Sequence, residues 1–268
     1  MEYYSVFISI HIQGDVVRKY IKHIIFSFAM ICLVVVSIFE IKNISEDVIK
    51  YMPVTNKTII LDAGHGGIDP GALNKDKSTS EKDINLAITL KLRELIESSG
   101  GLVILTREDD SSLYKEENNK TTRQKYNENL KNRKEIISNS NANMFVSIHL
   151  NAFEQSKYYG AQTFYPKDKQ DSKELSKCIQ EELKRVVDKT NNREVKPRDD
   201  IYLLKENNIP SVLIECGFLS NEKECKLLTD ETYQEKIAWA IYIGIQKYLS
   251  WNNYKNRSKY VNSLYESS

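Results

Sequence analysis

Short runs of aliphatic and β-branched residues alternate along the chain with segments in which apolar residues recur at helical spacing. The first pattern predicts strands, and the second predicts amphipathic helices. The predicted strands lie at residues 58–61, 102–106, 145–150, 162–165, 202–204 and 212–215. Several are continuous Val, Ile and Leu runs, typical of strands buried on both faces of a parallel sheet. The pattern predicts a single-domain α/β fold, with an open, twisted, mostly parallel sheet of about six strands flanked by helices.

The clearest helical segment begins at residues 80–83, Ser-Glu-Lys-Asp, which have the pattern of a capping box, and ends near Gly100. The polar segment 109–125 is predicted to be a loop. The polar, tyrosine-bearing end of the chain, 252–268, is predicted to be a solvated extension. Further helices are predicted at residues 127–139, 171–190 and 233–249.

An uncharged stretch of 16 residues, 24–39, follows three basic residues at positions 18, 19 and 22 and precedes Glu40. Its length falls between a signal-peptide core of about 7–15 residues and a membrane span of about 20. The bulky residues at its end do not form a cleavage site, which favours an uncleaved signal anchor; a cleaved signal peptide and a buried core helix are the alternatives. The positive charges before it place everything after Phe39 outside the cytoplasm.

These features divide the chain into successive parts. We expect a cytoplasmic N-terminus, a transmembrane signal anchor, a linker, one compact domain that carries the candidate chemistry, and a polar tail. The corresponding ranges are 1–23, 24–41, 42–56, 57–250 and 251–268.

Charge and cysteine content exclude some classes of protein. The 38 basic and 37 acidic residues nearly cancel, and no dense basic stripe with interleaved aromatic residues is present, so we expect no nucleic-acid partner. The domain holds Cys178, Cys216 and Cys225, without a CxxC motif, and their spacing does not indicate a metal cluster. We interpret them as small buried residues; a bridge from Cys216 or Cys225 is the alternative.

The chain holds four histidines, and His11 and His23 precede or enter the apolar stretch. The other two, His65 and His149, each follow a predicted strand, in LDAGHGG and VSIHLNA. Loops at the carboxyl ends of strands carry the functional groups of open α/β sheets. Two histidines in such positions favour a shared metal site over two structural histidines.

A catalytic zinc site has three protein ligands and one open position, so a third ligand is expected. Glu81, in the first turn of the predicted helix, is our candidate, although a carboxylate there is also favoured by the helix dipole. Asp62 is a rival, but on a strand its side chain and that of His65 point to opposite faces.

Glu215 ends the predicted strand 212–215, where three apolar residues, Val-Leu-Ile, lead into a single carboxylate in SVLIECGFLSN. Burial there would raise its pKa toward the range of a general base, whereas a surface glutamate at a strand end is the alternative. The glycines after His65 do not belong to an esterase or nucleotide site, because GxSxG, GxGxxG and the P-loop pattern are absent, as is HExxH.

Four blocks, LDAGHGGIDPGA, EKDINL, SIHLNA and VLIECGFLSN, occur in the order and rough spacing of the zinc-dependent N-acetylmuramoyl-L-alanine amidases. The chain resembles this family over residues 57–249. The stretches YYGAQTFYP, KTNNREVK and IYLLK resemble its germination-specific branch, which acts on the spore cortex. Ala63 and Cys216 depart from the usual family pattern, and a thiol beside Glu215 suggests sensitivity to oxidants.

The resemblance implies one Zn²⁺ ion held by the three candidate ligands, with Glu215 as the catalytic carboxylate. It also implies substrate-binding roles for Asn151 and Arg133, for which a turn-forming and a surface role are the alternatives. The implied reaction cleaves the amide bond between the lactyl group of muramic acid and L-alanine of peptidoglycan, leaving peptide-free glycan, the precursor of muramic lactam.

Two other functions stay open at this point. A catalytically silent wall-binding protein would retain the fold but lose functional side chains, and all four are present. A metal-dependent peptidase would cut within the stem peptide. The expected partners are peptidoglycan, the membrane through the N-terminal anchor, and an accessory protein that contacts segment 109–125 or the tyrosine-rich tail.

Overall fold

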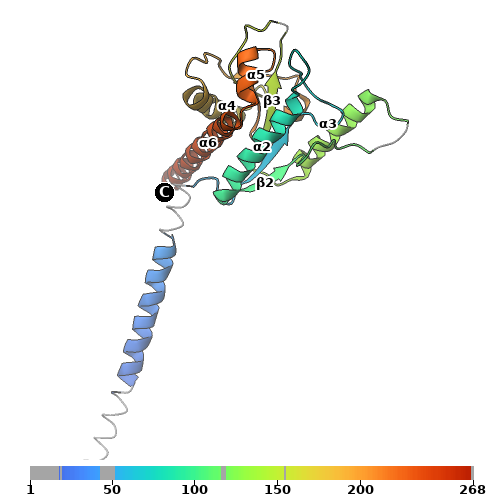
Figure 1. Ribbon diagram of the computed structural model, residues 1–268. Helices are drawn as coiled ribbons and strands as arrows, with labels where there is room; N and C mark the ends of the chain where they lie inside the picture. Colours follow the sequence, from blue (N-terminus) through green and yellow to red (C-terminus); the bar gives the residue numbers. More distant parts are fainter. Residues whose placement is uncertain (1–17, 19, 43–51, 116–118, 154, 267–268) are drawn as a thin grey trace, which may run out of the picture. The chain divides into compact units, whose positions relative to one another are not determined.

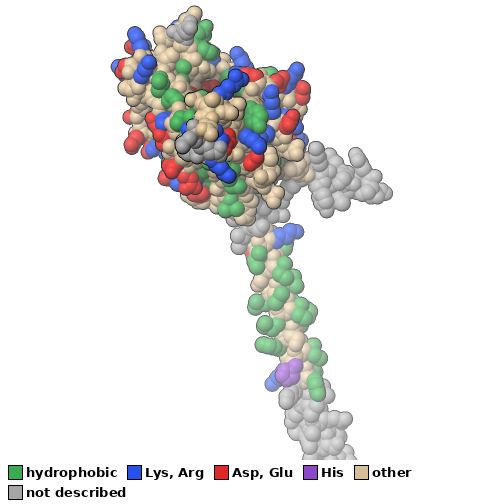
Figure 2. Space-filling model, turned by 90° about the vertical axis from the view of Figure 1, so that its right-hand side faces the viewer, with side chains coloured by type: hydrophobic (Ala, Val, Ile, Leu, Met, Phe, Trp, Pro, Cys, Tyr) green, Lys and Arg blue, Asp and Glu red, His purple; other side chains and the backbone are tan. Residues whose placement is uncertain are grey.

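The computed structural model describes residues 18, 20–42, 52–115, 119–153 and 155–266. The chain forms two compact units, Met1–Tyr51 and Met52–Ser268. In the first, helix Tyr20–Lys42 has 23 residues, and its most apolar stretch of 18 residues has a mean hydropathy of 2.7 with none of it buried, so its length and composition make it a candidate membrane span. Hydrophobic side chains cover it along its length (Figure 2). It contains the predicted span 24–41, whereas most of the predicted N-terminus and linker lies outside the described residues.

The second unit is built on a six-stranded sheet with the order β2-β1-β3-β6-β4-β5. β4 runs antiparallel to β6, and the other neighbouring pairs are parallel, so the predicted mostly parallel open α/β sheet is confirmed. The strands are β1 (Thr58–Ala63), β2 (Leu102–Leu105), β3 (Met144–Asn151), β4 (Gln162–Tyr165), β5 (Lys196–Pro197) and β6 (Ser211–Phe218).

Helices cover both faces of the sheet (Figure 1). The larger core lies under α2, α4 and α6, whose apolar residues pack against Leu61, Val146 and Ile214 of the central strands. The smaller core lies under α3 and η2, against Ile60 and Phe145. The helices are α2 (Glu81–Ser98), α3 (Thr122–Asn139), α4 (Gln170–Glu182), α5 (Glu222–Leu228) and α6 (Glu231–Glu266), with a π-helical turn η1 (Leu183–Val187) and a 3₁₀ turn η2 (Tyr202–Leu204).

Two local predictions were wrong. Residues 202–204, predicted as a strand, form η2, because the neighbours Leu203 and Leu204 both pack into the smaller core, which an alternating strand would not allow. The capping box predicted at Ser80 does not form: its hydroxyl donates to the Asp83 carboxylate, and no backbone N–H of α2 donates to it.

Helix boundaries also differ from the prediction at both polar segments. The predicted loop 109–125 ends early, because Thr121 and Gln124 form a reciprocal capping box that starts α3 at Thr122. The predicted C-terminal extension belongs instead to α6, which continues through Glu266. β5 and α5 were missed: the first is an exposed pair of residues, and the second is a short helix capped by Asn221.

Candidate active site

His65 lies in a tight turn that follows β1. Its φ of 65° is in the left-handed region, and backbone hydrogen bonds in both directions between Gly66 and Asp69 close the turn. The Asp69 carboxylate lies 2.8 Å from His65 Nδ1, and since a carboxylate only accepts, Nδ1 carries the proton and donates. This contact leaves Nε2 as the ring nitrogen that faces the site.

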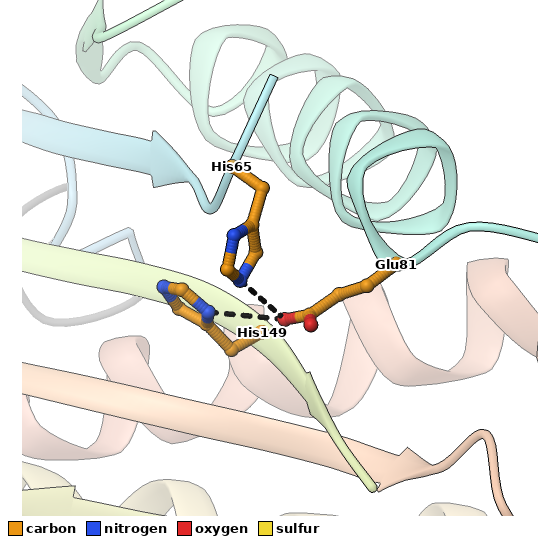
Figure 3. Close-up of side chains that lie close together, drawn as sticks. All are labelled: His65, Glu81 and His149. Carbon is orange, nitrogen blue, oxygen red and sulfur yellow. Dashed lines mark hydrogen bonds and ion pairs between the residues drawn. The ribbon is translucent and has the colours of Figure 1, made fainter. Parts of the chain in front are cut away.

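Glu81, the first residue of α2, brings its carboxylate between the two histidines (Figure 3). Its Oε1 atom lies 3.2 Å from Nε2 of His65 and 3.1 Å from Nδ1 of His149. The three ligand atoms lie within 4.8 Å of one another, so the structure brings together the residues that the sequence analysis selected for the metal.

The Glu81 carboxylate is held from several sides. Backbone N–H groups of Ala72 and Leu150 donate to its two oxygens, at 2.8 Å and 2.9 Å. One turn further along α2, the Asn85 amide donates to the same carboxylate at 3.2 Å and to the Gly64 carbonyl at 3.3 Å. Asn85 therefore ties the start of α2 to the loop that carries His65.

The residues present fit a divalent cation. Two imidazole nitrogens and one carboxylate oxygen are a common donor set for catalytic zinc. Burial alone would raise the pKa of Glu81, but its contacts with His149 and His65 lower that pKa well below its usual range, so the group is ionised. No metal ion is part of the structure; the fit rests on the donor set and its convergence.

Glu215 lies on β6 directly opposite His149 of β3. Leu213, two residues earlier, packs in the smaller core, so the Glu215 side chain projects from that same face of the sheet. Its Oε2 atom is buried and has no hydrogen-bond partner among the described residues. Burial raises the pKa of Glu215 to about 7, which suits a group that takes up and releases a proton near neutral pH.

Arg133 lies beneath the His65 loop rather than on the surface. It is 2% exposed, donates to the buried Asp62 carboxylate at 2.7 Å and to the Ala63 carbonyl at 2.9 Å, and also donates to the His65 carbonyl. These contacts give Arg133 a part in holding the loop, and they occupy Asp62, the rival ligand. A direct contact between Arg133 and substrate has no support in this geometry.

Arg107 is a second buried support that the sequence analysis missed. It donates to the carbonyls of Ala63, Gly64 and Lys82, at distances from 2.7 Å to 3.1 Å, and so joins the His65 loop to the first turn of α2. Its position one residue after the predicted strand 102–106 was the available signal, since such a position lies at the functional edge of the sheet.

Asp69 and Asn85 were also missed as functional residues. Asp69 stands four residues after His65 within GHGGIDPG, and Asn85 stands four residues after Glu81, one helical turn away. Asn151 ends β3 at a bulge, where its carbonyl accepts a hydrogen bond from Leu219. A contact of its side chain with substrate stays a prediction.

The cysteines take no part in the site. Cys216 is buried in the larger core, on the opposite face from Glu215, and burial raises the pKa of its thiol well above the usual value. This argues against the oxidant sensitivity expected from its position in the sequence. Cys178 and Cys225 are free thiols, as is Cys32, so the alternative of a bridge within the described chain does not hold.

Comparisons with known proteins agree with this geometry. A family model described as N-acetylmuramoyl-L-alanine amidase matches residues 59–247. A germination-specific N-acetylmuramoyl-L-alanine amidase of Bacillus subtilis (strain 168) is 37% identical over 233 residues, 87% of this chain and 97% of the relative.

Solved structures show the same relationship. A CwlD amidase from Clostridioides difficile, solved in complex with the GerS lipoprotein, is 99% identical, with a TM-score of 0.72 over 73% of this chain and 99% of that chain. An N-acetylmuramoyl-L-alanine amidase from Clostridium difficile 630 is 34% identical, with a TM-score of 0.63 over 73% of this chain and 97% of that one. The chain is an enzyme that belongs to the N-acetylmuramoyl-L-alanine amidase family.

Proposed function

We propose that this amidase is zinc-dependent and acts on the peptidoglycan of the spore cortex. The observation that carries the proposal is the convergence of His65, Glu81 and His149 around one point, with Glu215 on the neighbouring strand. Zinc held by these three side chains would supply Lewis acidity toward the carbonyl of the scissile amide.

Glu215 performs the proton transfers. Its carboxylate accepts a proton from the water that attacks the lactyl carbonyl of muramic acid, and a bond forms between that carbon and the water oxygen. When the carbon–nitrogen bond breaks, the same group returns the proton to the departing amine of L-alanine. A pKa of about 7 favours both steps, because the group changes its protonation state readily near neutral pH.

The relatives support a particular biological substrate. The similarity to a germination-specific amidase supports action on the spore cortex rather than on the vegetative wall. Hydrolysis then leaves glycan without peptide, which is the precursor of the muramic lactam needed for germination. The enzyme works outside the cytoplasm, in the space around the developing spore, held by helix Tyr20–Lys42 as a signal anchor.

A lipoprotein is the expected accessory partner. The 99% identical amidase was solved in complex with the GerS lipoprotein, which supports the same association for this chain. Co-purification of the full chain with such a lipoprotein from detergent-solubilised membranes tests the assignment. Failure of the two proteins to associate in detergent and in vesicles would rule out the lipoprotein as a partner.

The reaction is tested by digesting purified cortex peptidoglycan with the zinc-loaded full chain, with and without the lipoprotein, and identifying the products by mass spectrometry. We expect peptide-free glycan together with peptides that begin at L-alanine. Fragments cut within the stem peptide would show that the enzyme acts as a peptidase rather than as an amidase. A Glu215→Gln protein serves as the matched control, and peptide release equal to that of the unmodified protein would exclude the role of Glu215.

A further inference from the structure

Helix α6 continues well beyond the core of the domain. Tyr248 and Leu249 are its last buried residues, at 2% and 3% exposure. From Trp251 onward no described side chain is buried, yet the helix extends to Glu266. At about 1.5 Å per residue this extension is roughly 25 Å long. Because none of the described side chains beyond Leu249 is buried, this part of α6 is open to a partner surface.

The sequence places three of the four aromatic residues of the extension on one helical face, and the fourth, Tyr260, on the opposite face. Trp251, Tyr254, Ser258, Val261 and Tyr265 recur at the spacing that places residues along one stripe of a helix. In the described part of this stripe, Trp251 is 38% exposed and Tyr254 is 74% exposed. Tyr254 therefore points to solvent, and Trp251 keeps part of its ring exposed.

The extension carries a net positive charge. From residue 250 to the end of the chain, the basic residues are Lys255, Arg257 and Lys259, and Glu266 is the one acidic residue. The Lys255 ammonium lies 4.7 Å from the centre of the Trp251 ring and 3.4 Å from the carboxylate of Asp171, an exposed pair that exchanges readily with other anions. An aromatic stripe flanked by basic residues is typical of helices that lie in the headgroup region of anionic bilayers.

Val54, near the N-terminal boundary of the domain, lies beside the last buried turns of α6. The Val54 N–H donates to the Gln246 side chain at 3.1 Å, one turn before the end of the buried part of α6. The Ser99 carbonyl accepts a hydrogen bond from the Thr55 hydroxyl, and Ser99 Oγ lies 2.6 Å from the hydroxyl of Tyr242 on α6. The segment that leads back to the candidate membrane span and the α6 extension thus emerge from one end of the domain.

The length of the connection limits how far that end can lie from a bilayer. Residues 43–51 separate Lys42, the last residue of the candidate span, from Met52, the first residue of the domain. Ten residue steps reach at most roughly 35 Å even when fully extended. A bilayer crossed by the span is therefore within reach of the extension.

We propose that residues 250–266 bind the surface of an anionic bilayer as a second membrane contact, with the Trp251 stripe in the headgroup region and the basic side chains beside lipid phosphates. The inference rests on the proposed N-terminal anchor and is independent of the amidase reaction. In this proposal the end of α6 binds lipid. The test below also distinguishes this contact from one with an accessory protein.

The chain contains two tryptophans, which makes the test direct. In a Trp239→Phe protein, Trp251 is the sole tryptophan; in a Trp251→Phe protein, Trp239 is the sole tryptophan, on the same helix and 45% exposed. Each full-length variant is reconstituted into vesicles of phosphatidylcholine and phosphatidylglycerol that carry brominated acyl chains, and tryptophan quenching is measured. Equal unfolding temperatures of the variants establish that both are folded.

We expect strong quenching of Trp251 and weak quenching of Trp239. Replacing Lys255, Arg257 and Lys259 by Gln should weaken the contact roughly a hundredfold, since each basic residue near an anionic surface contributes about fivefold. Quenching of Trp251 no stronger than that of Trp239 would overturn the proposal, as would equal quenching in vesicles of phosphatidylcholine alone. Quenching that appears only when the lipoprotein is added would assign the stripe to a protein partner instead. Unchanged peptide release by the Gln variant in detergent shows that the amidase site is unaffected.

Discussion

His149 and Glu215 lie directly opposite each other on the parallel strands β3 and β6, and their side chains project from the same face of the sheet. Strands in a sheet lie about 4.8 Å apart, so the register alone sets a candidate metal ligand beside the proposed catalytic carboxylate. A one-residue slip of either strand would turn one of the two side chains to the opposite face. The register of β3 and β6 is therefore a requirement of the chemistry as well as of the fold.

A Glu215→Gln protein should retain zinc and lose turnover. The amide has nearly the same shape as the carboxylate but does not accept a proton, so we expect kcat to fall about 10²–10⁴-fold. Metal analysis of the purified protein and single-turnover release of peptide measure the two quantities. A loss of zinc comparable to that of a His149→Ala protein would instead make Glu215 a ligand.

The same substitution should stabilise the metal-free protein at alkaline pH. Burial raises the pKa of Glu215 from its ordinary 4.5 to about 7. Between these values the unfolded chain has lost the proton that the folded chain keeps, so the stability of the unmodified protein falls as pH rises. Above pH 7 the Gln variant should be more stable by about 3 kcal/mol, and below pH 4.5 the two should be equal. Urea denaturation in the presence of a chelator at several pH values checks this; a pH-independent difference would contradict the buried, neutral carboxyl group.

Asp69→Asn should weaken zinc binding without unfolding the domain. The Asp69 carboxylate accepts a hydrogen bond from His65 Nδ1–H and so leaves Nε2 to face the proposed metal. Loss of such a partner typically weakens metal affinity 10–100-fold. Competition with a zinc chelator measures the affinity. Asp76→Asn, at an exposed aspartate in the following loop, is the control. Equal zinc affinities of the two variants would show that Asp69 stabilises the turn without affecting zinc binding.

Arg133→Met should destabilise the whole domain. The substitution leaves the buried Asp62 carboxylate without its guanidinium partner, and breaking such a pair typically costs about 3–5 kcal/mol. Arg185→Met removes an exposed arginine from Glu182, whose buried carboxylate keeps a second cationic partner in Lys247, so this change should cost less than about 1 kcal/mol. The comparison is made by urea denaturation. A cost at Arg133 as small as that at Arg185, together with a raised KM, would restore the substrate-binding role that the sequence suggested.

Gly71→Ala should impair the metal site. Gly71 has a φ of 64°, and a Cβ there would lie 2.6 Å from Glu81 Oε2 and 2.7 Å from His65 Cδ2. Gly100→Ala is the control, because Gly100 also has a positive φ, of 78°, but its nearest contact would be a Thr55 methyl group at 3.3 Å. Both variants should lose about 1–2 kcal/mol of stability, and the first should also bind zinc more weakly. Zinc affinity unchanged in Gly71→Ala would mean that the turn tolerates a side chain.

The sequence predicted the central strands well because they are buried on both faces. Continuous aliphatic runs such as 145–150 have few other structural explanations, and β1, β3, β4 and β6 formed where the runs lie. The errors concern short or polar elements. Residues 202–204 have strand-like composition but lie in a turn set by tertiary packing, and α3 has few apolar residues to reveal its helical period.

The convergence of the candidate ligands was predictable because histidines are rare in this chain and strand ends mark the functional edge of the sheet. The residues that support these side chains were not predictable from the sequence. Asp69, Asn85 and Arg107 act through hydrogen bonds to the ligands or to the loop that carries them, and such contacts depend on the packing of α2 against β1 and β2. Arg133 is a different case: the resemblance suggested a substrate contact, and in the structure this side chain is buried and paired with Asp62.

The central claim, that His65, Glu81 and His149 hold one zinc ion, is tested most directly by X-ray absorption at the zinc edge of the loaded full chain. The account predicts one zinc per chain with nitrogen and oxygen neighbours at about 2.0–2.2 Å, including the signature of two imidazole rings. In a His149→Ala protein one imidazole should be lost along with most of the zinc. Sulfur neighbours at about 2.3 Å, or the same two-imidazole signature in the His149→Ala protein, would contradict the assignment.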